Sequence, residues 1–146
     1  MNISKILATY DFSETSNRAL AFAATLAQQT GAQLDLVYVL ADLYDGRADP
    51  SLLPATYPGE MERYLRFLQE ELHRMVKVVI PEFAGKVTCH ALRGDPVKHI
   101  ETLAAELSAS VVAVGATGKG AVARIMLGSV AQNLLRSSTI PVLVVP

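Results

Sequence analysis

Glycines and basic residues gather in one stretch near the carboxyl end of the chain. Gly115-Ala116-Thr117-Gly118-Lys119-Gly120 is followed, after a short apolar run, by Gly128-Ser129. Glycines allow main-chain N–H groups to approach an anion without obstruction by a Cβ atom. A helix that begins at Gly128-Ser129 would direct further N–H groups and the positive end of its dipole toward that anion. Lys119 and Arg124 supply positive charge, so the stretch favours phosphate binding.

Two common phosphate motifs do not fit this stretch. The dinucleotide-binding fingerprint follows the first strand of its fold, whereas this glycine cluster follows the fourth strand that we expect. A P-loop requires Ser or Thr after Gly-Lys, but Gly120 follows Gly118-Lys119 here. Tight packing between a strand and a loop would also select glycine, so the glycines alone leave a packing role open.

The elements that position this stretch follow from the hydrophobic pattern. Short apolar runs predict five strands, over residues 5–10, 34–40, 86–92, 111–115 and 142–145. Helical spacing predicts helices over residues 14–30, 60 to about 80, from 96 onward, and about 128–136. Ser13 and Asp95 are the expected N-caps, and Gly31 is the expected stop of the first helix.

Strands that alternate with helices imply right-handed crossovers and a parallel sheet. We therefore expect an α/β fold, one three-layer domain over residues 1–146, with the flavodoxin- or Rossmann-like strand order 3-2-1-4-5. The first and fourth strands are then neighbours, and their carboxyl ends form the binding crevice. Asp11 follows the first strand and Gly115 ends the fourth, so both should lie there.

Composition excludes several classes of function. The 146 residues are 51% hydrophobic, with a net charge of -1 and a pI near 6.3, which argues against nucleic-acid and anionic-membrane partners. We expect a cytoplasmic protein, because the chain starts without a leader-like segment and no apolar run reaches spanning length. Cys89 is the only cysteine, and we interpret it as a buried small hydrophobe. His73, His90 and His99 lack metal-ligand spacing, so no metal site is predicted.

Two segments require further interpretation. Prolines and glycines interrupt residues 41–59, which form either a lid or a surface insertion. The helix from residue 60 carries an apolar stripe that we expect to cover the sheet, made of Tyr64, Leu65, Leu68, Leu72, Met75, Val76 and Val79.

Four parts of the chain together resemble the universal stress protein family. They are residues 5–13 with Asp11, the helix start at Gly94-Asp95-Pro96, the pattern Gly115-x2-Gly118-x9-Gly128-Ser129, and the ending from Ser129 to Val145. The resemblance extends over nearly the whole chain. It implies a fold similar to adenine nucleotide alpha-hydrolases and, in the family's ATP-binding branch, ATP as ligand with Mg²⁺ or another divalent cation.

The resemblance also implies the roles of individual residues. Thr9, Tyr10 and Asp11 would line the adenosine end, and the backbone of Val39 would meet adenine. Val114, Gly115 and Gly118 would approach ribose and phosphate, with Lys119 beside them. The phosphates would be held at a helix start by Gly128, Ser129, Val130 and Ala131. Three positions depart from the family pattern: Phe12 replaces a common glycine, Thr117 a basic or histidine residue, and Ser110 an acidic residue. These departures concern nucleotide preference.

Three functions remain as hypotheses. The first is an ATP-binding stress-response or signalling module read by an unidentified protein partner. The second is an enzyme, at most a slow ATPase, because Asp11 is the only obvious carboxylate near the crevice and no catalytic residue is assigned. The third is a nucleotide-free interaction module in which the glycines serve packing and Asp11 caps or turns the chain. If the strand over residues 142–145 lies at the sheet edge, its unpaired backbone groups predict a homodimer through this strand, and the family resemblance implies the same.

Overall fold

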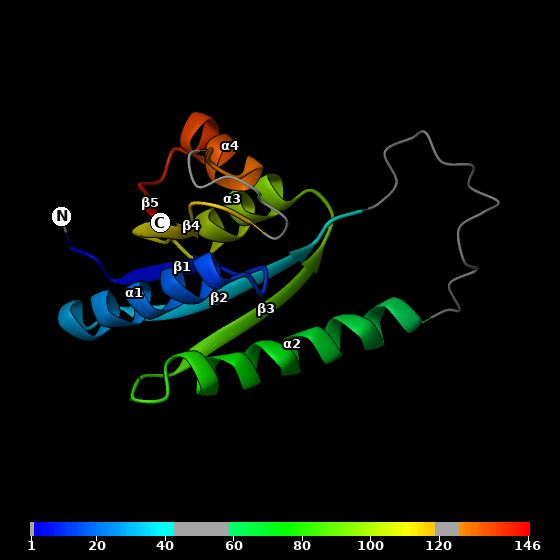
Figure 1. The fold of residues 1–146 in the computed structure, drawn as a ribbon, viewed down its shortest axis with the longest axis horizontal. Helices are drawn as coiled ribbons and strands as arrows, with labels where there is room; N and C mark the ends of the chain where they lie inside the picture. Colours follow the sequence, from blue (N-terminus) through cyan, green and yellow to red (C-terminus); the bar gives the residue numbers. More distant parts are fainter. Residues whose placement is uncertain (1, 43–58, 119–125) are drawn as a thin grey trace.

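Short apolar runs form the five parallel strands that the sequence predicts (Figure 1). The computed structural model describes residues 2–42, 59–118 and 126–146. Within them the strands are β1 (Lys5–Thr9), β2 (Gln33–Leu40), β3 (Val87–Arg93), β4 (Val111–Gly115) and β5 (Val142–Val145). Their ends differ from the predicted ones by a single residue where they differ, as is usual for strand termini.

The helices between the strands are α1 (Glu14–Thr30), α2 (Glu60–Val79), α3 (Pro96–Glu106) and α4 (Ser129–Ser137). Ser13 caps α1 by accepting a hydrogen bond from the Ser16 N–H, and Asp95 caps α3 by accepting one from the Lys98 N–H. Gly31 ends α1 in the left-handed region, with φ of 73°, which glycine adopts without steric cost. The predicted caps and stop are therefore confirmed.

The strands lie in the order β3-β2-β1-β4-β5, and every pair is parallel. Leu7 in β1 pairs with Asp35 in β2 on one side and with Val112 in β4 on the other. The predicted fold class and order 3-2-1-4-5 are confirmed. Because α1 and α4 lie on opposite faces of the sheet, the chain diverges beyond β1 and β4 and leaves a crevice at their carboxyl ends.

The hydrophobic core has one part on each face of the sheet, as expected of strands covered on both sides. Leu20 from α1 and Leu72 from α2 belong to the part that includes Ile6 and Leu36. Residues from α3 and α4 form the part on the other face: Leu7, Val37, Ile100, Leu103, Ala104, Val112, Val114, Ala131 and Leu134 all belong to it. Figure 1 shows α1 and α2 on one side of the sheet and α3 and α4 on the other.

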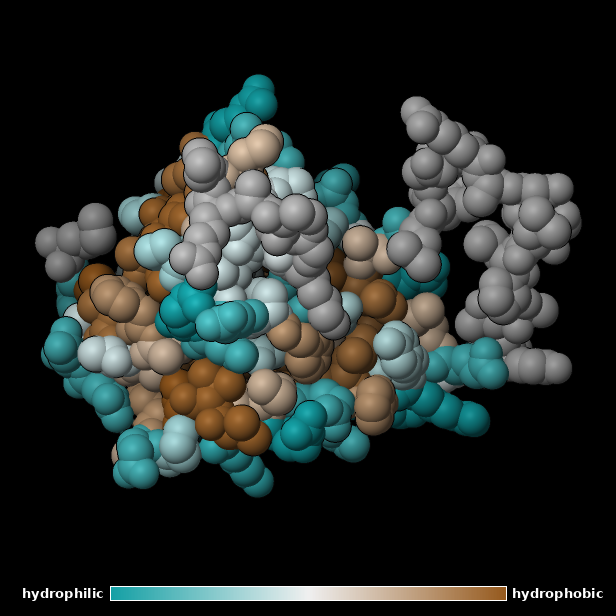
Figure 2. All heavy atoms as spheres, viewed as in Figure 1, coloured by the Kyte–Doolittle hydropathy of each residue, from teal (hydrophilic) through white to brown (hydrophobic). Residues whose placement is uncertain are grey.

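The apolar stripe of α2 is buried only in part, which corrects the expectation that all of it covers the sheet. Leu68 and Leu72 are buried, but Tyr64 is 46% exposed and stacks on the exposed ring of Phe67. Figure 1 shows the first turns of α2 extending past the end of β3. On the face seen in Figure 2, hydrophobic residues are interspersed with hydrophilic ones.

Two expectations involve residues that the structure does not describe. Residues 43–58, which make up most of the lid or insertion segment, lie outside the described residues, as do Lys119 and Arg124. Among the helices that are described, none has the length and apolar content needed to cross a membrane.

Candidate functional site: a cavity at the carboxyl ends of the central strands

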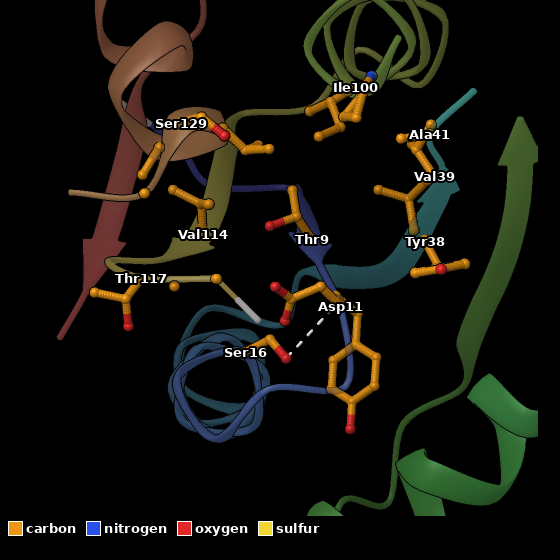
Figure 3. Close-up of a pocket in the computed structure, with 18 residues that line it drawn as sticks. Thr9, Asp11, Ser16, Tyr38, Val39, Ala41, Ile100, Val114, Thr117 and Ser129 are labelled. Carbon is orange, nitrogen blue, oxygen red and sulfur yellow. Dashed lines mark hydrogen bonds between the residues drawn. The ribbon is translucent and has the colours of Figure 1, made fainter. Parts of the chain in front are cut away.

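A cavity of about 320 Å³ lies where β1, β2 and β4 end, on the face of the sheet that α3 and α4 cover. Its floor comes from the strands, and its walls come from the first turns of α3 and α4 and from the loop after β4 (Figure 3). This is the crevice that the strand order predicts.

The predicted site residues converge on this cavity, although they come from four separate parts of the sequence. Those that line it are Thr9, Tyr10, Asp11, Val39, Val114, Gly115, Gly118, Gly128, Ser129, Val130 and Ala131. Lys119 lies outside the described residues.

The cavity also has lining residues that the sequence reasoning missed: Ser16, Val37, Tyr38, Ala41, Pro96, Ile100 and Thr117. A signal was available for some of them. Val37 precedes Val39 by two residues, so both point to the same face of β2. Ile100 lies one turn after the capped start of α3, in line with Pro96.

The first turn of α4 brings main-chain donors to one end of the cavity. Gly128 is the N-cap of this helix, and no side chain caps it. The N–H groups of the first helical turn have no partner within a helix, and they carry the positive end of its dipole. Ser129, Val130 and Ala131 all line the cavity. An anion fits this end.

Close backbone contacts hold the glycine loop against its neighbours. A Cβ atom on Gly115 would lie 2.9 Å from the carbonyl carbon of Thr15, and one on Gly128 would lie 3.1 Å from the backbone nitrogen of Gly118. A larger residue at Gly115 would therefore meet α1. Packing alone accounts for Gly115 and explains much of Gly128.

Gly118 has a different environment, because the atom nearest to a Cβ at this position belongs to the side-chain carboxylate of Asp11 and not to the backbone. A Cβ atom there would lie 3.0 Å from Oδ2 of Asp11. The other carboxylate oxygen, Oδ1, accepts a hydrogen bond of 3.0 Å from the Ser13 N–H. Asp11 thus makes the turn contact considered from the sequence, while its second oxygen lies on the Gly118 side.

The loop after β4 is also tied to α1 by a hydroxyl group. Thr15 Oγ1 donates a hydrogen bond to the carbonyl oxygen of Thr117. Thr15 Oγ1 also lies 3.2 Å from the hydroxyl oxygen of Ser13. Thr15 is 9% exposed, so this bond is shielded from water and fixes where Gly118 lies.

The charge of Asp11 affects a neighbouring ring. Burial, and then the negative charge of Asp11, raises the pKa of the Tyr10 hydroxyl above its ordinary value. That hydroxyl donates a hydrogen bond to Oδ1 of Asn17, on α1. Tyr10 is therefore a neutral hydrogen-bond donor at physiological pH.

The histidines and the cysteine lie elsewhere. His73, His90 and His99 belong to α2, β3 and α3, and Cys89 is buried in β3, so its interpretation as a buried hydrophobe is confirmed. Within the described ranges, no three His, Cys, Asp or Glu residues gather in a group that could hold a metal ion.

Known proteins are similar to this chain over nearly its whole length. The model of the universal stress protein family matches residues 2–146. A universal stress protein of Methanocaldococcus jannaschii is 32% identical over 145 residues, which is 97% of this chain and 81% of that protein.

Solved structures share the fold. UspA from Lactobacillus plantarum superposes with a TM-score of 0.81 at 22% identity, over 100% of this chain and 99% of that one. A universal stress protein from Archaeoglobus fulgidus, solved in complex with dAMP, has a TM-score of 0.67 at 23% identity, over 100% of both chains. The family match and the relative from Methanocaldococcus jannaschii show that this chain belongs to the universal stress protein family.

Proposed function

We propose that this protein binds ATP in the cavity at the ends of β1, β2 and β4, as a member of the ATP-binding branch of its family, and acts as a nucleotide-dependent stress-response or signalling module. One observation carries the proposal: a single cavity has main-chain hydrogen-bond donors at one end and apolar side chains elsewhere in its lining. Main-chain donors from α4 lie at one end, and the lining of the rest includes apolar side chains of β2, β4 and α3.

The phosphates would lie at the start of α4. Main-chain N–H groups of Ser129, Val130 and Ala131 would donate to phosphate oxygens, and the Ser129 hydroxyl would add a donor. Gly118 and Gly128 would let the backbone approach. Lys119, whose role rests on the family resemblance, would supply positive charge beside them.

The nucleoside would occupy the apolar part. Val39 would meet adenine through its backbone, and Thr9, Tyr10 and Asp11 would line the adenosine end, with Val114 and Gly115 near the ribose. The structural relative from Archaeoglobus fulgidus was solved in complex with dAMP, which supports an adenine nucleotide as ligand.

Mg²⁺ or another divalent cation would accompany ATP. Asp11 is the one acidic residue that lines the described cavity, so the protein offers few oxygen ligands of its own. Mg²⁺ commonly keeps several waters and binds through substrate phosphates, which suits this arrangement. The same scarcity of carboxylates and histidines supports at most slow hydrolysis, since phosphoryl transfer needs a residue that orients the nucleophile.

The protein would act in the cytoplasm as a homodimer that a further protein recognises. β5 lies at the edge of the sheet, with β4 on one side, and an edge strand offers unpaired N–H and C=O groups. We propose a homodimer through β5, read by a further protein partner. The Val112 and Ala116 N–H groups donate to the carbonyl oxygens of Pro141 and Val145, so the backbone groups of Val144, between these residues, face away from β4. Sedimentation of the wild type against Val144→Pro tests this, because proline removes the outward-facing backbone donor; a wild type that sediments as a monomer contradicts it.

One observation favours the nucleotide-free alternative. Gly115 and Gly128 are needed for close packing whether or not a ligand binds, so their presence alone does not require a nucleotide. Gly118 and Ser129 separate the two hypotheses, because a Cβ atom on Gly118 would meet only the side-chain carboxylate of Asp11 and no backbone atom, and Ser129 lines the cavity at the start of α4.

The deciding experiment begins with denaturing the purified protein and identifying any released nucleotide. ATP is then titrated, with and without Mg²⁺, into stripped wild type, Gly118→Ala and Ser129→Ala. Ser137→Ala is the matched control, because Ser137 is the last residue of the same helix. Micromolar ATP binding that Gly118→Ala and Ser129→Ala weaken, and Ser137→Ala leaves unchanged, supports the proposal. Absence of both bound nucleotide and ATP binding leaves the dimeric interaction module.

A further inference from the structure

Thr9 places a hydroxyl group inside the apolar part of the cavity. The residue is only 7% exposed. Figure 3 shows its side-chain oxygen directed into the cavity, between Val114 and Asp11. This hydroxyl makes no hydrogen bond to another described residue, and no buried side-chain oxygen in the described ranges lacks a partner, so the Thr9 oxygen is open to the cavity. A polar group at this position is available to hydrogen-bond whatever fills the cavity.

The neighbouring polar side chains already have partners. Ser16 Oγ donates to the Ser13 carbonyl oxygen over 2.8 Å, and Oδ1 of Asp11 accepts from the Ser13 N–H. The remaining side chains near Thr9 on the adjacent strands and on α3 are the apolar Val39, Val114 and Ile100. A ligand is therefore the natural source of a partner for Thr9.

We infer that the Thr9 hydroxyl is a specificity-determining group that hydrogen-bonds the nucleoside part of the ligand, at a sugar hydroxyl or at a nitrogen of the base. The inference rests on the proposed nucleotide binding and adds to it which side chain recognises the uncharged part of the nucleotide. A hydroxyl both donates and accepts, so it can satisfy either kind of group.

Two features assign Thr9 to the nucleoside and not to the phosphates. Thr9 belongs to β1, between Val39 of β2 and Val114 of β4, whereas the main-chain donors suited to phosphate come from α4. The carboxylate of Asp11 also faces the space beside Thr9 in Figure 3. A negative charge there disfavours an anionic group at short range.

The test compares Thr9→Val, which keeps the shape and removes the hydroxyl, with Thr9→Ser, which keeps the hydroxyl. Binding of ATP, adenosine and tripolyphosphate is measured by calorimetry. Loss of one hydrogen bond corresponds to roughly a 3- to 10-fold weaker binding. We expect Thr9→Val to weaken ATP and adenosine by the same factor and to leave tripolyphosphate unchanged, while Thr9→Ser binds all three like the wild type.

A measurement without ligand gives a second readout. If the hydroxyl serves the ligand and not the fold, Thr9→Val has a thermal midpoint at least as high as that of the wild type. A lower midpoint would reveal a structural partner and overturn the inference.

Further titrations locate the partner group. 2′-Deoxyadenosine and 3′-deoxyadenosine test the sugar, and 1-, 3- and 7-deazaadenosine test the ring nitrogens. The analogue that lacks the partner should bind wild type and Thr9→Val equally. Equal binding of every ligand to both proteins would contradict the inference but leave the proposed function standing. A wild type that binds neither ATP nor adenosine would overturn both.

Discussion

Gly115 at the end of β4 packs directly against Thr15 in the first turn of α1, so closely that a Cβ atom on Gly115 would lie 2.9 Å from both the carbonyl carbon and the hydroxyl oxygen of Thr15. The same hydroxyl donates to Thr117. A strand end, a helix start and a loop therefore meet at a single point beside the cavity. Substitutions at this contact should therefore lower the free energy of unfolding more than they weaken ligand binding.

Gly115→Ala should be strongly destabilising, because the added methyl group meets backbone atoms that cannot move alone. We expect the free energy of unfolding to fall by about 1–3 kcal/mol, the usual cost of overpacking, as measured by urea denaturation. Gly118→Ala is the control. Its methyl group would meet only the carboxylate of Asp11, at 3.0 Å, and should lower stability less. Equal losses in the two variants would contradict the assignment of Gly115 to packing.

Phe12 occupies a backbone conformation that favours glycine, with φ of 64°. Its ring packs edge-on against Tyr10 and Tyr38, with centroid distances of 5.1 and 5.4 Å. The aromatic contacts, each typically about 0.5–1.5 kcal/mol, hold a residue whose left-handed conformation costs about 1–2 kcal/mol.

The strain at Phe12 can be measured by comparing two truncations. Phe12→Ala and Phe12→Gly both remove the ring, but only glycine adopts this φ without cost. We expect Phe12→Gly to be more stable than Phe12→Ala by about 1 kcal/mol in urea denaturation. At Ala21, on α1, the same exchange should reverse the order, since glycine is unfavourable inside a helix. An alanine variant as stable as the glycine variant would show that residue 12 carries no strain.

The sequence predicted the sheet order and the cavity well, because both follow from periodic patterns. The alternation of strands and helices restricts topology, and the strand order then places Asp11 beside the glycine loop. The features that the sequence did not predict depend on where each helix and strand ends in the three-dimensional structure. Tyr64 fits the stripe of α2 but is 46% exposed. Ser16 lines the cavity only because the first turn of α1 lies beside it. The left-handed conformation of Phe12 follows from the turn after β1.

The partner of a buried carboxylate gives a further prediction. Asp35 in β2 is 4% exposed, and its Oδ1 lies 2.7 Å from Nε2 of His90 in the neighbouring strand β3. His90→Leu would leave this carboxylate without its partner, so we expect a loss of roughly 1–3 kcal/mol in the free energy of unfolding. The same substitution at exposed His73 should change stability by less than about 0.5 kcal/mol.

A double variant tests whether the loss comes from the unpaired carboxylate. Replacing a buried polar pair by apolar residues is often close to neutral. Asp35→Leu with His90→Leu should therefore regain part of the stability that His90→Leu loses. A double variant less stable than His90→Leu would assign the effect to lost packing of the imidazole ring.

Cys89 should make stability depend on pH in the alkaline range. Burial, and then the negative charge of Asp35, raises the pKa of its thiol from 9.0 to about 11. Below pH 9 both folded and unfolded chains hold the proton. Between pH 9 and 11 the unfolded chain releases it and the folded chain retains it, so stability falls as pH rises. At about 1.4 kcal/mol per pH unit, the fall is at most about 2–3 kcal/mol over this window.

Cys89→Ala isolates this contribution, because tyrosines and lysines that titrate in the same range are common to both proteins. The variant loses packing at every pH, so it should be less stable than the wild type at pH 8. The difference between the two should then shrink from pH 9 to 11, as followed by urea denaturation. The native thiol should also resist a disulfide reagent at pH 8 and react once urea unfolds the chain, because the thiolate is the nucleophile. A constant difference together with rapid labelling of the native protein would mean that Cys89 is accessible and that its thiol titrates normally.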